Sequence, residues 1–351
     1  MKKFLAKILS AALAALCIFS VSACAKDTTE GDGNNTPPAN KLYLSGSLQQ
    51  LYGGEEGYPQ AVIVAKKSFT AQYPEWTNGF IAKLNNAETY LKTAESSTII
   101  NALASKLTDG ETPAFNAKNL SAATVKNCNV KFVAASAEKE AVRAVLTGMM
   151  GANAPQTSDE FFYTPAEAQA DEVAPEIISI TSPDGAPALA LVQMIEEGDN
   201  IVDFKIVNAN TITTYVTNTD DTKNSDFCIM PVNAAAKLLG NGEKYQMLGT
   251  VTHGNLFMVS SNAEAQYTNK EQLQTLIGKT VGVIQIANVP GMVFKMILNK
   301  YEIPFTVISG GDEPAADKVN LAGITDAAQV TPDGDYSAYV IAEPLVSLRT
   351  K

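Results

Sequence analysis

Polar side chains recur in four short stretches of the sequence, each at the end of a predicted strand and the start of a predicted helix. The stretches are Ser182–Pro187, Met230–Ala234, Thr252–Asn255 and Gln285–Gly291. Their hydrogen-bonding groups come from Ser182, Asp184, Gly185, Asn233, His253, Asn255, Gln285 and Asn288. These groups lack redox and nucleophilic power, so the set suits the reversible binding of a small solute.

Each of these residues also has a purely structural interpretation. Ser182 or Asp184 can cap the helix that follows, because their side chains accept hydrogen bonds from first-turn N–H groups. Glu343, at the end of a further strand, can simply close that strand. Turn or cap roles are equally open for Asn233, His253 and Asn288.

Catalytic chemistry finds little support in the sequence. His253 is the only histidine, so no zinc cluster with histidine ligands can be built, and no G-x-S-x-G nucleophile elbow is present. The sequence lacks a P-loop and a Rossmann glycine fingerprint, and no acidic pair is set apart by its spacing. We therefore expect no enzymatic activity, no metal and no cofactor.

The elements that position these loops alternate from Glu176 onward. The predicted strands are Ile177–Thr181, Val202–Val207, Ser225–Met230, Tyr245–Thr250, Thr280–Ile284, Phe305–Ile308 and Ala338–Ala342. Helices are predicted to start near Ala186, Thr211, Pro231 and Val289. The alternation predicts an α/β fold of mainly parallel sheets, in which the loops after the strands converge on a crevice.

The part of the chain between residues 42 and 163 is richer in helix. One strand is predicted at Gln60–Ala65. In the helix after it, apolar residues recur every fourth position from Trp76, which favours a core role for Trp76 over a ligand platform. The polar segment 164–175 reads as a connector to the α/β part.

Residues 1–24 predict an export signal. Lysines precede the apolar run Ile8–Phe19, which is shorter than the ~20 residues of a membrane span. The following Val21–Cys24 resembles the bacterial lipobox, whose cysteine is lipidated. Residues 25–41 are polar and typical of a flexible tether. We expect an exported protein that is lipid-anchored through Cys24 at the extracytoplasmic face of the cell membrane; a secretory signal with a chance cysteine is the alternative.

Charge and cysteine content limit the class of binding partner and the possible disulfide bonds. The net charge is −11, and removal of the leader would take away three lysines and no acids. Nucleic acid is therefore not expected as a partner, since a phosphate-binding face needs clustered Lys and Arg. Cys128 and Cys228 remain in the body of the chain, either as one disulfide or as two buried thiols.

Several stretches together resemble the ABC-transporter substrate-binding proteins of the nitrate, sulfonate, taurine and thiamine-precursor group. The stretches are "TSPDGAPALALVQMI", "DFCIMPVNAAAKLL", "GKTVGVIQIANVPGMVFKMIL", "AYVIAEPLVSL", "YPQAVIVAKKSFTAQYPEW" and "SDEFFY". The resemblance implies the type II periplasmic-binding-protein-like fold, in which two α/β lobes close around a solute. It also implies a monomer that delivers the solute to ABC permease subunits, with the first three polar loops in one lobe and Gln285–Pro290 and Glu343 in the other.

The order of these stretches departs from the usual family arrangement. The "TSPDGAP" strand usually follows the tether directly, whereas here the "YPQAVIVAKKSF" part precedes it, so the chain resembles a circular permutant. Permutation is physically reasonable where termini are close and the new break lies in an exposed loop. The predicted lobes are then discontinuous, with residues 68–163 and 172–270 in the first, residues 42–67 and 271–351 in the second, and the connector at 164–175.

The expected function is capture of a small polar organic solute or oxyanion for an ABC importer. Helix N-termini favour an anion, whereas Asp184 and Glu343 would favour an amine or aminopyrimidine, so the charge of the ligand stays open. Two other classes are weighed against this one. They are an enzyme on the same fold, similar to thiamine-pyrimidine synthases, and a surface lipoprotein that binds a macromolecule.

Overall fold

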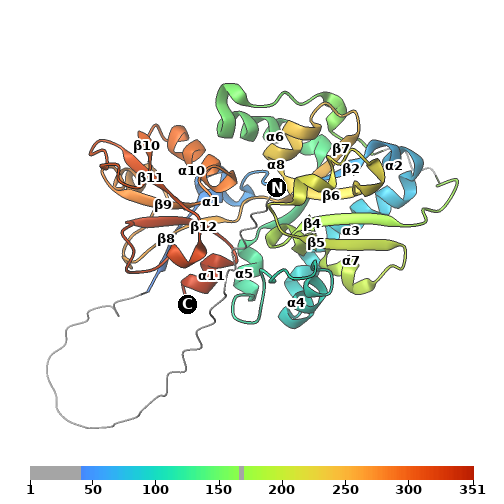
Figure 1. Cartoon of the computed structure of the whole chain (residues 1–351), viewed down its shortest axis with the longest axis horizontal. Coiled ribbons are helices and arrows are strands. Elements are labelled where there is room, and N and C mark those ends of the chain that lie inside the picture. The colour runs from blue at the N-terminus through green and yellow to red at the C-terminus, as the bar shows by residue number, and fades with distance from the viewer. Residues whose placement is uncertain (1–40, 166–169) are drawn as a thin grey trace, which may run out of the picture. The chain divides into compact units, whose positions relative to one another are not determined.

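The computed structural model describes residues 41–165 and 170–351 (Figure 1). The expected signal, nearly all of the expected tether, and residues 166–169 of the expected connector lie outside this part. The described chain is a mixed α/β structure with two six-stranded sheets flanked by helices. Of the helices in this part, none has the length and apolar character of a membrane span.

We call the part of the molecule around each sheet a lobe. The sheet of lobe B has the strand order β3-β7-β2-β6-β4-β5. Its strands are β2 (Ala61–Lys66), β3 (Val130–Ala134), β4 (Ile178–Pro183), β5 (Val202–Val207), β6 (Phe227–Pro231) and β7 (Tyr245–Thr252). Its longer helices are α3 (Pro74–Thr93), α4 (Ser96–Ala104), α6 (Ala135–Met150) and α8 (Val232–Leu239). Shorter ones are α2 (Lys67–Gln72), α5 (Ala122–Asn127), α7 (Val192–Glu197) and the 3-10 helix η4 (Ala186–Leu191).

Lobe A contains the sheet with the strand order β1-β8-β12-β9-β11-β10. Its strands are β1 (Tyr43–Ser47), β8 (Leu256–Ser260), β9 (Thr280–Ile284), β10 (Phe305–Ile308), β11 (Val319–Ile324) and β12 (Ala338–Ala342). Its helices are α1 (Leu48–Gly53), α9 (Lys270–Gln274), α10 (Val289–Lys300) and α11 (Leu345–Arg349).

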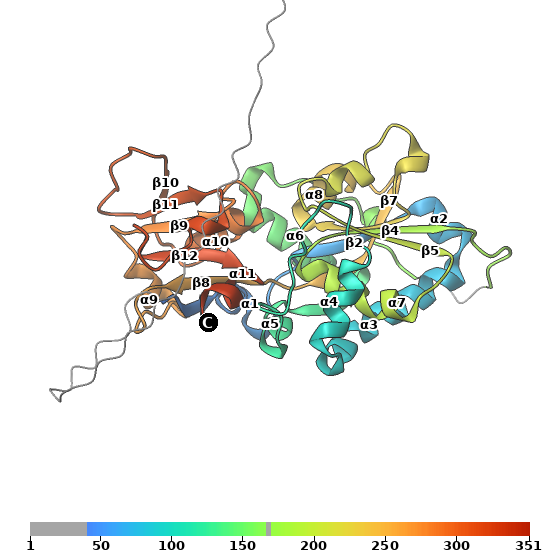
Figure 2. The same ribbon diagram turned by 60° about the horizontal axis from the view of Figure 1, so that its bottom comes forward.

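The sheet of lobe B is covered by helices on both faces. In the central strand β2, Val62 and Val64 face one apolar core with α6 and α8, whereas Ile63 faces the other core with α3, α4 and α7. Figure 2 shows α8 on one side of this sheet and α3, α4 and α7 on the other. A strand buried on both faces reads as a continuous apolar run, and this explains the sequence "AVIVA".

Helix α3 begins at Pro74 and contains the segment around Trp76 in which the sequence predicts a helix. Pro74 occupies its first turn, and the Asp171 carboxylate accepts hydrogen bonds from the backbone N–H groups of Glu75 and Trp76. The Trp76 ring stacks on Phe80 with a centroid separation of 5.3 Å and packs against Phe227. Trp76 is therefore a core residue, as its helical spacing indicates.

Both sheets are mixed, and parallel pairings are the majority in lobe A, as expected, but the minority in lobe B. In lobe B, β2 runs antiparallel to both of its neighbours, and β3 is antiparallel to β7. In lobe A, β8 runs antiparallel to β1 and β12. Strands β1, β3, β8 and β11 were not predicted, and the helix expected near Thr211 is the short 3-10 helix Ile212–Tyr215.

The membership of the sheets also corrects the expected lobe boundaries. Strand β2 was expected in the second lobe but pairs with β6 and β7, and β8 was expected in the first lobe but pairs with β1 and β12. The chain therefore passes between the sheets in two crossovers, residues 54–60 and 253–255. Strand pairing, rather than position in the chain, sets these boundaries.

The two cysteines of the body do not form a disulfide bond with each other. Cys128 and Cys228 are both fully buried and free, so the disulfide alternative is excluded. Burial raises the pKa of both thiols, and the nearby Glu343 carboxylate raises that of Cys128 further.

Candidate functional site

The two crossovers between the lobes are bound to each other by a reciprocal pair of hydrogen bonds. The side-chain amide of Gln60 donates to Asn255 Oδ1 at 2.7 Å, and the backbone N–H of Asn255 donates to Gln60 Oε1 at 3.1 Å. Gly57, with φ of 68°, lies so close to His253 that a Cβ atom there would be 2.0 Å from the His253 carbonyl oxygen. Asn255 therefore joins the crossovers through its side-chain oxygen and its backbone N–H.

His253 is buried in the second crossover and paired with a carboxylate. Its Nε2 atom lies 2.7 Å from Glu138 Oε1, and the two residues are 4% and 9% exposed. The His253 carbonyl accepts hydrogen bonds from the Asn129 side chain at 2.7 Å and from Tyr58 N–H at 3.3 Å. The imidazole thus connects helix α6 to the crossover, which is a structural role.

A cluster of four side chains, here called the α5–α11 latch, joins lobe B to lobe A. The carboxylate of Glu343, which is 4% exposed, accepts from Asn127 Nδ2 at 2.8 Å and from Ser347 N–H and Oγ, each at 3.0 Å. Thr124 Oγ1 donates to Ser347 Oγ at 2.8 Å. Two of these residues lie in α5, and the other two lie in and just before α11, so the latch spans the lobes.

The first polar loop is held by contacts within lobe B. Asp184 accepts backbone hydrogen bonds from Ala114 at 2.7 Å and Gly185 at 2.8 Å. Burial raises the pKa of this carboxyl group, and the two hydrogen bonds offset part of that rise. Ser182 is fully buried, and its hydroxyl donates to the adjacent Pro183 carbonyl. Neither side chain caps η4, whose N-cap residue is Gly185 with φ of 106°.

The remaining predicted residues lie around the start of α10. Asn233 reaches across from α8 and donates to Met292 Sδ at 3.7 Å, while its Oδ1 atom is buried with no partner in the described chain. Gln285 has a positive φ of 48° and donates its backbone N–H to the Ile324 carbonyl. Asn288 is the N-cap residue of α10, without a side-chain cap hydrogen bond.

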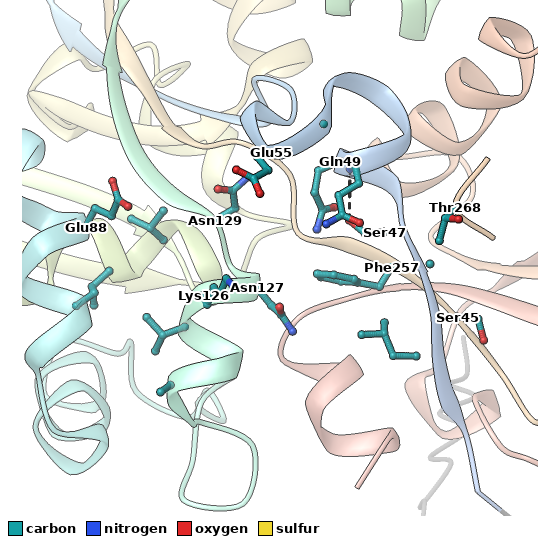
Figure 3. Close-up of a pocket in the computed structure, with 18 of the residues that line it drawn as sticks. Ser45, Ser47, Gln49, Glu55, Glu88, Lys126, Asn127, Asn129, Phe257 and Thr268 are labelled. Carbon is teal, nitrogen blue, oxygen red and sulfur yellow. Dashed lines mark hydrogen bonds between the residues drawn. The ribbon is translucent and has the colours of Figure 1, made fainter. Parts of the chain in front are cut away.

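A groove of about 870 Å³ lies beside the crossovers and is lined by both lobes (Figure 3). Helices α3 and α5 and strand β3 line it from lobe B, and β1, α1 and β8 from lobe A. None of the nine predicted ligand-binding residues lines it. Two of the lining residues nevertheless contact predicted ones, since Asn127 binds Glu343 and Asn129 binds the His253 carbonyl.

The lining of the groove has the chemistry of a binding site. Amides and hydroxyl groups are accompanied by two lysines, two glutamates and apolar side chains that include Phe257. Gln49 is 8% exposed, and its Oε1 atom has no hydrogen-bond partner in the described chain. In residues 41–165 and 170–351, no group of three or more His, Cys, Asp or Glu side chains has the arrangement of a metal site.

The sequence did not reveal this groove, because of the elements that form it only α3 was predicted as a feature of interest. Of the lining segments, β1, β3 and β8 were unassigned and α5 was not singled out. Of the loops that were singled out, 252–255 contains the second crossover and Asn233 contacts α10 of lobe A, whereas Ser182 and Asp184 are held within lobe B. Direct contact between those residues and a ligand stays a prediction.

Comparison of the chain with protein-family models, with curated proteins and with solved structures finds no match.

Proposed function

We propose that the protein is a lipid-anchored, extracytoplasmic solute-binding protein of an ABC importer, and that it binds a small polar organic solute or oxyanion in the groove between its lobes. The observation that carries this proposal is the groove, because both lobes line it beside the two crossovers that connect them. Its volume lies in the range of small-molecule sites. A solute that contacts both lobes favours the arrangement in which the lobes are close together.

Reversible binding suits the groove better than catalysis does. Its polar groups are amides, hydroxyls, ammonium groups and carboxylates, which hold a solute by hydrogen bonds and charge. The only imidazole of the chain is outside the lining and is engaged with Glu138. A general base held by a buried partner away from the solute cannot reach the proton that it would abstract.

The family resemblance and its permuted segment order support the same proposal. The chain passes between the sheets twice, so lobe B is one continuous segment and lobe A combines the segments before and after it, which is compatible with a two-lobed binding protein. Leu42 and Val346, from the first and last described segments, belong to one apolar cluster in lobe A. Segments that are adjacent in the usual family order are therefore also close in space.

The proposed membrane attachment depends on Cys24. Metabolic labelling with a palmitate analogue in a bacterial host should modify the full chain and direct it to the membrane fraction. Cys24→Ser should abolish both. Labelling that persists in this variant would contradict attachment through Cys24.

The binding function can be tested by native mass spectrometry of gently purified protein, followed by identification of the released solute. Ala122 is exposed and lines the groove, whereas its neighbour Ala123 is exposed but lies outside the lining. Ala122→Trp should weaken binding of the identified solute by about tenfold or more by occupying the groove, and Ala123→Trp should leave binding unchanged. Equal affinity in both variants would place the site elsewhere.

A further inference from the structure

Two opposite charges in the groove have no partner among the residues that the structure describes. Lys126 lies on α5 in lobe B, and Glu55 lies in the first crossover, next to α1. The other lysine, Lys92, is paired with Glu88 at 2.8 Å. The lining therefore presents one free cation and one free anion, carried by different elements (Figure 3).

A buried acceptor lies on the same side as the free anion. Gln49 of α1 is only 8% exposed, and its Oε1 atom has no donor in the described chain. Buried acceptors in proteins are nearly always satisfied, because an unmade hydrogen bond costs free energy. An ammonium group has three N–H donors, so one such group can serve both Glu55 and Gln49.

The free cation provides the complementary half of the site. The Lys126 ammonium attracts an oxyanion, and the lining also includes the apolar side chains of Leu91, Val125 and Phe257. A neutral solute that covered either free charge would remove water from it without supplying a counter-charge, which is unfavourable. A solute with only one charge would compensate either Lys126 or Glu55 and leave the other of these two residues without a counter-charge.

From these contacts we infer that the solute is a zwitterion with an ammonium and a carboxylate group, an amino acid or a short peptide. Its carboxylate binds Lys126, and its ammonium binds Glu55 and Gln49. This inference rests on the proposed function, because it identifies the solute class of the same groove. Since Lys126 belongs to lobe B and Gln49 to lobe A, such a solute bridges the lobes, and its binding stabilises their close arrangement.

The test measures binding of amino acids and dipeptides to the full chain by calorimetry. The tightest binder is then compared with its N-acetyl derivative and with its C-terminal amide. Each derivative should bind at least about tenfold more weakly, because it lacks one charge. Lys126→Gln should weaken binding of the parent compound but not of the amide, and Glu55→Gln should weaken binding of the parent but not of the N-acetyl derivative.

Matched controls are available on the surface. Lys118 and Glu313 are exposed residues outside the groove, so Lys118→Gln and Glu313→Gln should leave affinity unchanged. Native mass spectrometry separates the two ways of failing. A captured solute that is neutral or singly charged, or equal affinity for the parent and both derivatives, would overturn the zwitterion inference while the binding function stands. Absence of any bound small molecule, with no binding from the panel, would overturn both.

Discussion

The side-chain amide of Asn127 donates a 2.8 Å hydrogen bond to the carboxylate of Glu343, although the two residues are 216 positions apart. Asn127 belongs to lobe B and lines the groove, whereas Glu343 follows β12 of lobe A. The bond is thus both part of the wall of the groove and part of the contact between the lobes. The contact between the lobes and the wall of the groove therefore share the Asn127 side chain.

Loss of the Glu343 carboxylate should open the lobes. Glu343→Ala leaves the half-buried donors of Asn127 and Ser347 without this acceptor, which should lower the free energy of unfolding by about 1 kcal/mol. Small-angle scattering should show a larger radius of gyration. Glu313→Ala, at an exposed position with no side-chain hydrogen bond or ion pair in the described chain, is the control. An unchanged radius in Glu343→Ala would contradict a latch role.

The Glu138–His253 pair should respond asymmetrically to removal of its partners. His253→Ala leaves a buried carboxylate alone, whereas Glu138→Ala leaves an imidazole that can be neutral. We expect His253→Ala to cost about 3 kcal/mol in urea unfolding at neutral pH, and Glu138→Ala to cost less. Glu140→Ala, which removes an exposed ion pair with Arg143, should cost under about 1 kcal/mol. Equal losses of unfolding free energy in His253→Ala and Glu138→Ala would contradict the role of His253 in stabilising the Glu138 carboxylate.

The Asp184 carboxyl should make stability depend on pH with an unusual sign. Burial raises its folded-state pKa, so the folded protein binds this proton more tightly than the unfolded chain does. Its contribution to stability is then fully present below the ordinary aspartate pKa and is lost as pH rises through the raised value. The free energy of unfolding of the wild type minus that of Asp184→Asn should therefore increase as the pH falls from neutral to acid.

Asp220 supplies a control of opposite sign for that experiment. Hydrogen bonds from Thr222 lower the folded-state pKa of Asp220. Its contribution is present above the ordinary pKa and is lost as pH falls, so the difference between the wild type and Asp220→Asn should change in the other direction. The same trend for both variants would contradict the burial effect at Asp184.

Restoring the usual family order of segments should preserve the fold. A chain that runs from residue 172 to 351 and continues through a short linker into residues 42–163 keeps every strand of both sheets intact. We expect its melting temperature to stay within a few degrees of that of the original order. A break between Ile63 and Val64, inside the buried central strand β2, should prevent folding. Failure of the first rearrangement would contradict the permutation proposal.

Local sequence patterns were sufficient to predict many of the elements. The bounds of β5, β9, β10 and β12 were predicted correctly, because β9, β10 and β12 are short, mainly apolar runs between polar loops and β5 alternates apolar with charged residues. Strands β1 and β8 were not predicted. They pair with each other across more than 200 residues of chain. Such strands are stabilised by distant partners, so their own residues carry a weak signal.

The sequence alone determined the α/β character, the helix at Trp76 and the clustering of polar residues after the strands. Only the tertiary structure decided what those residues contact. Glu343 binds Asn127, His253 binds Glu138 and Asn255 binds Gln60, and each partner lies more than 100 residues away. The groove likewise combines Gln49 and Lys126 from different lobes. Hydrogen bonds and cavities depend on which atoms meet in space, and residue types along the chain do not specify those long-range meetings.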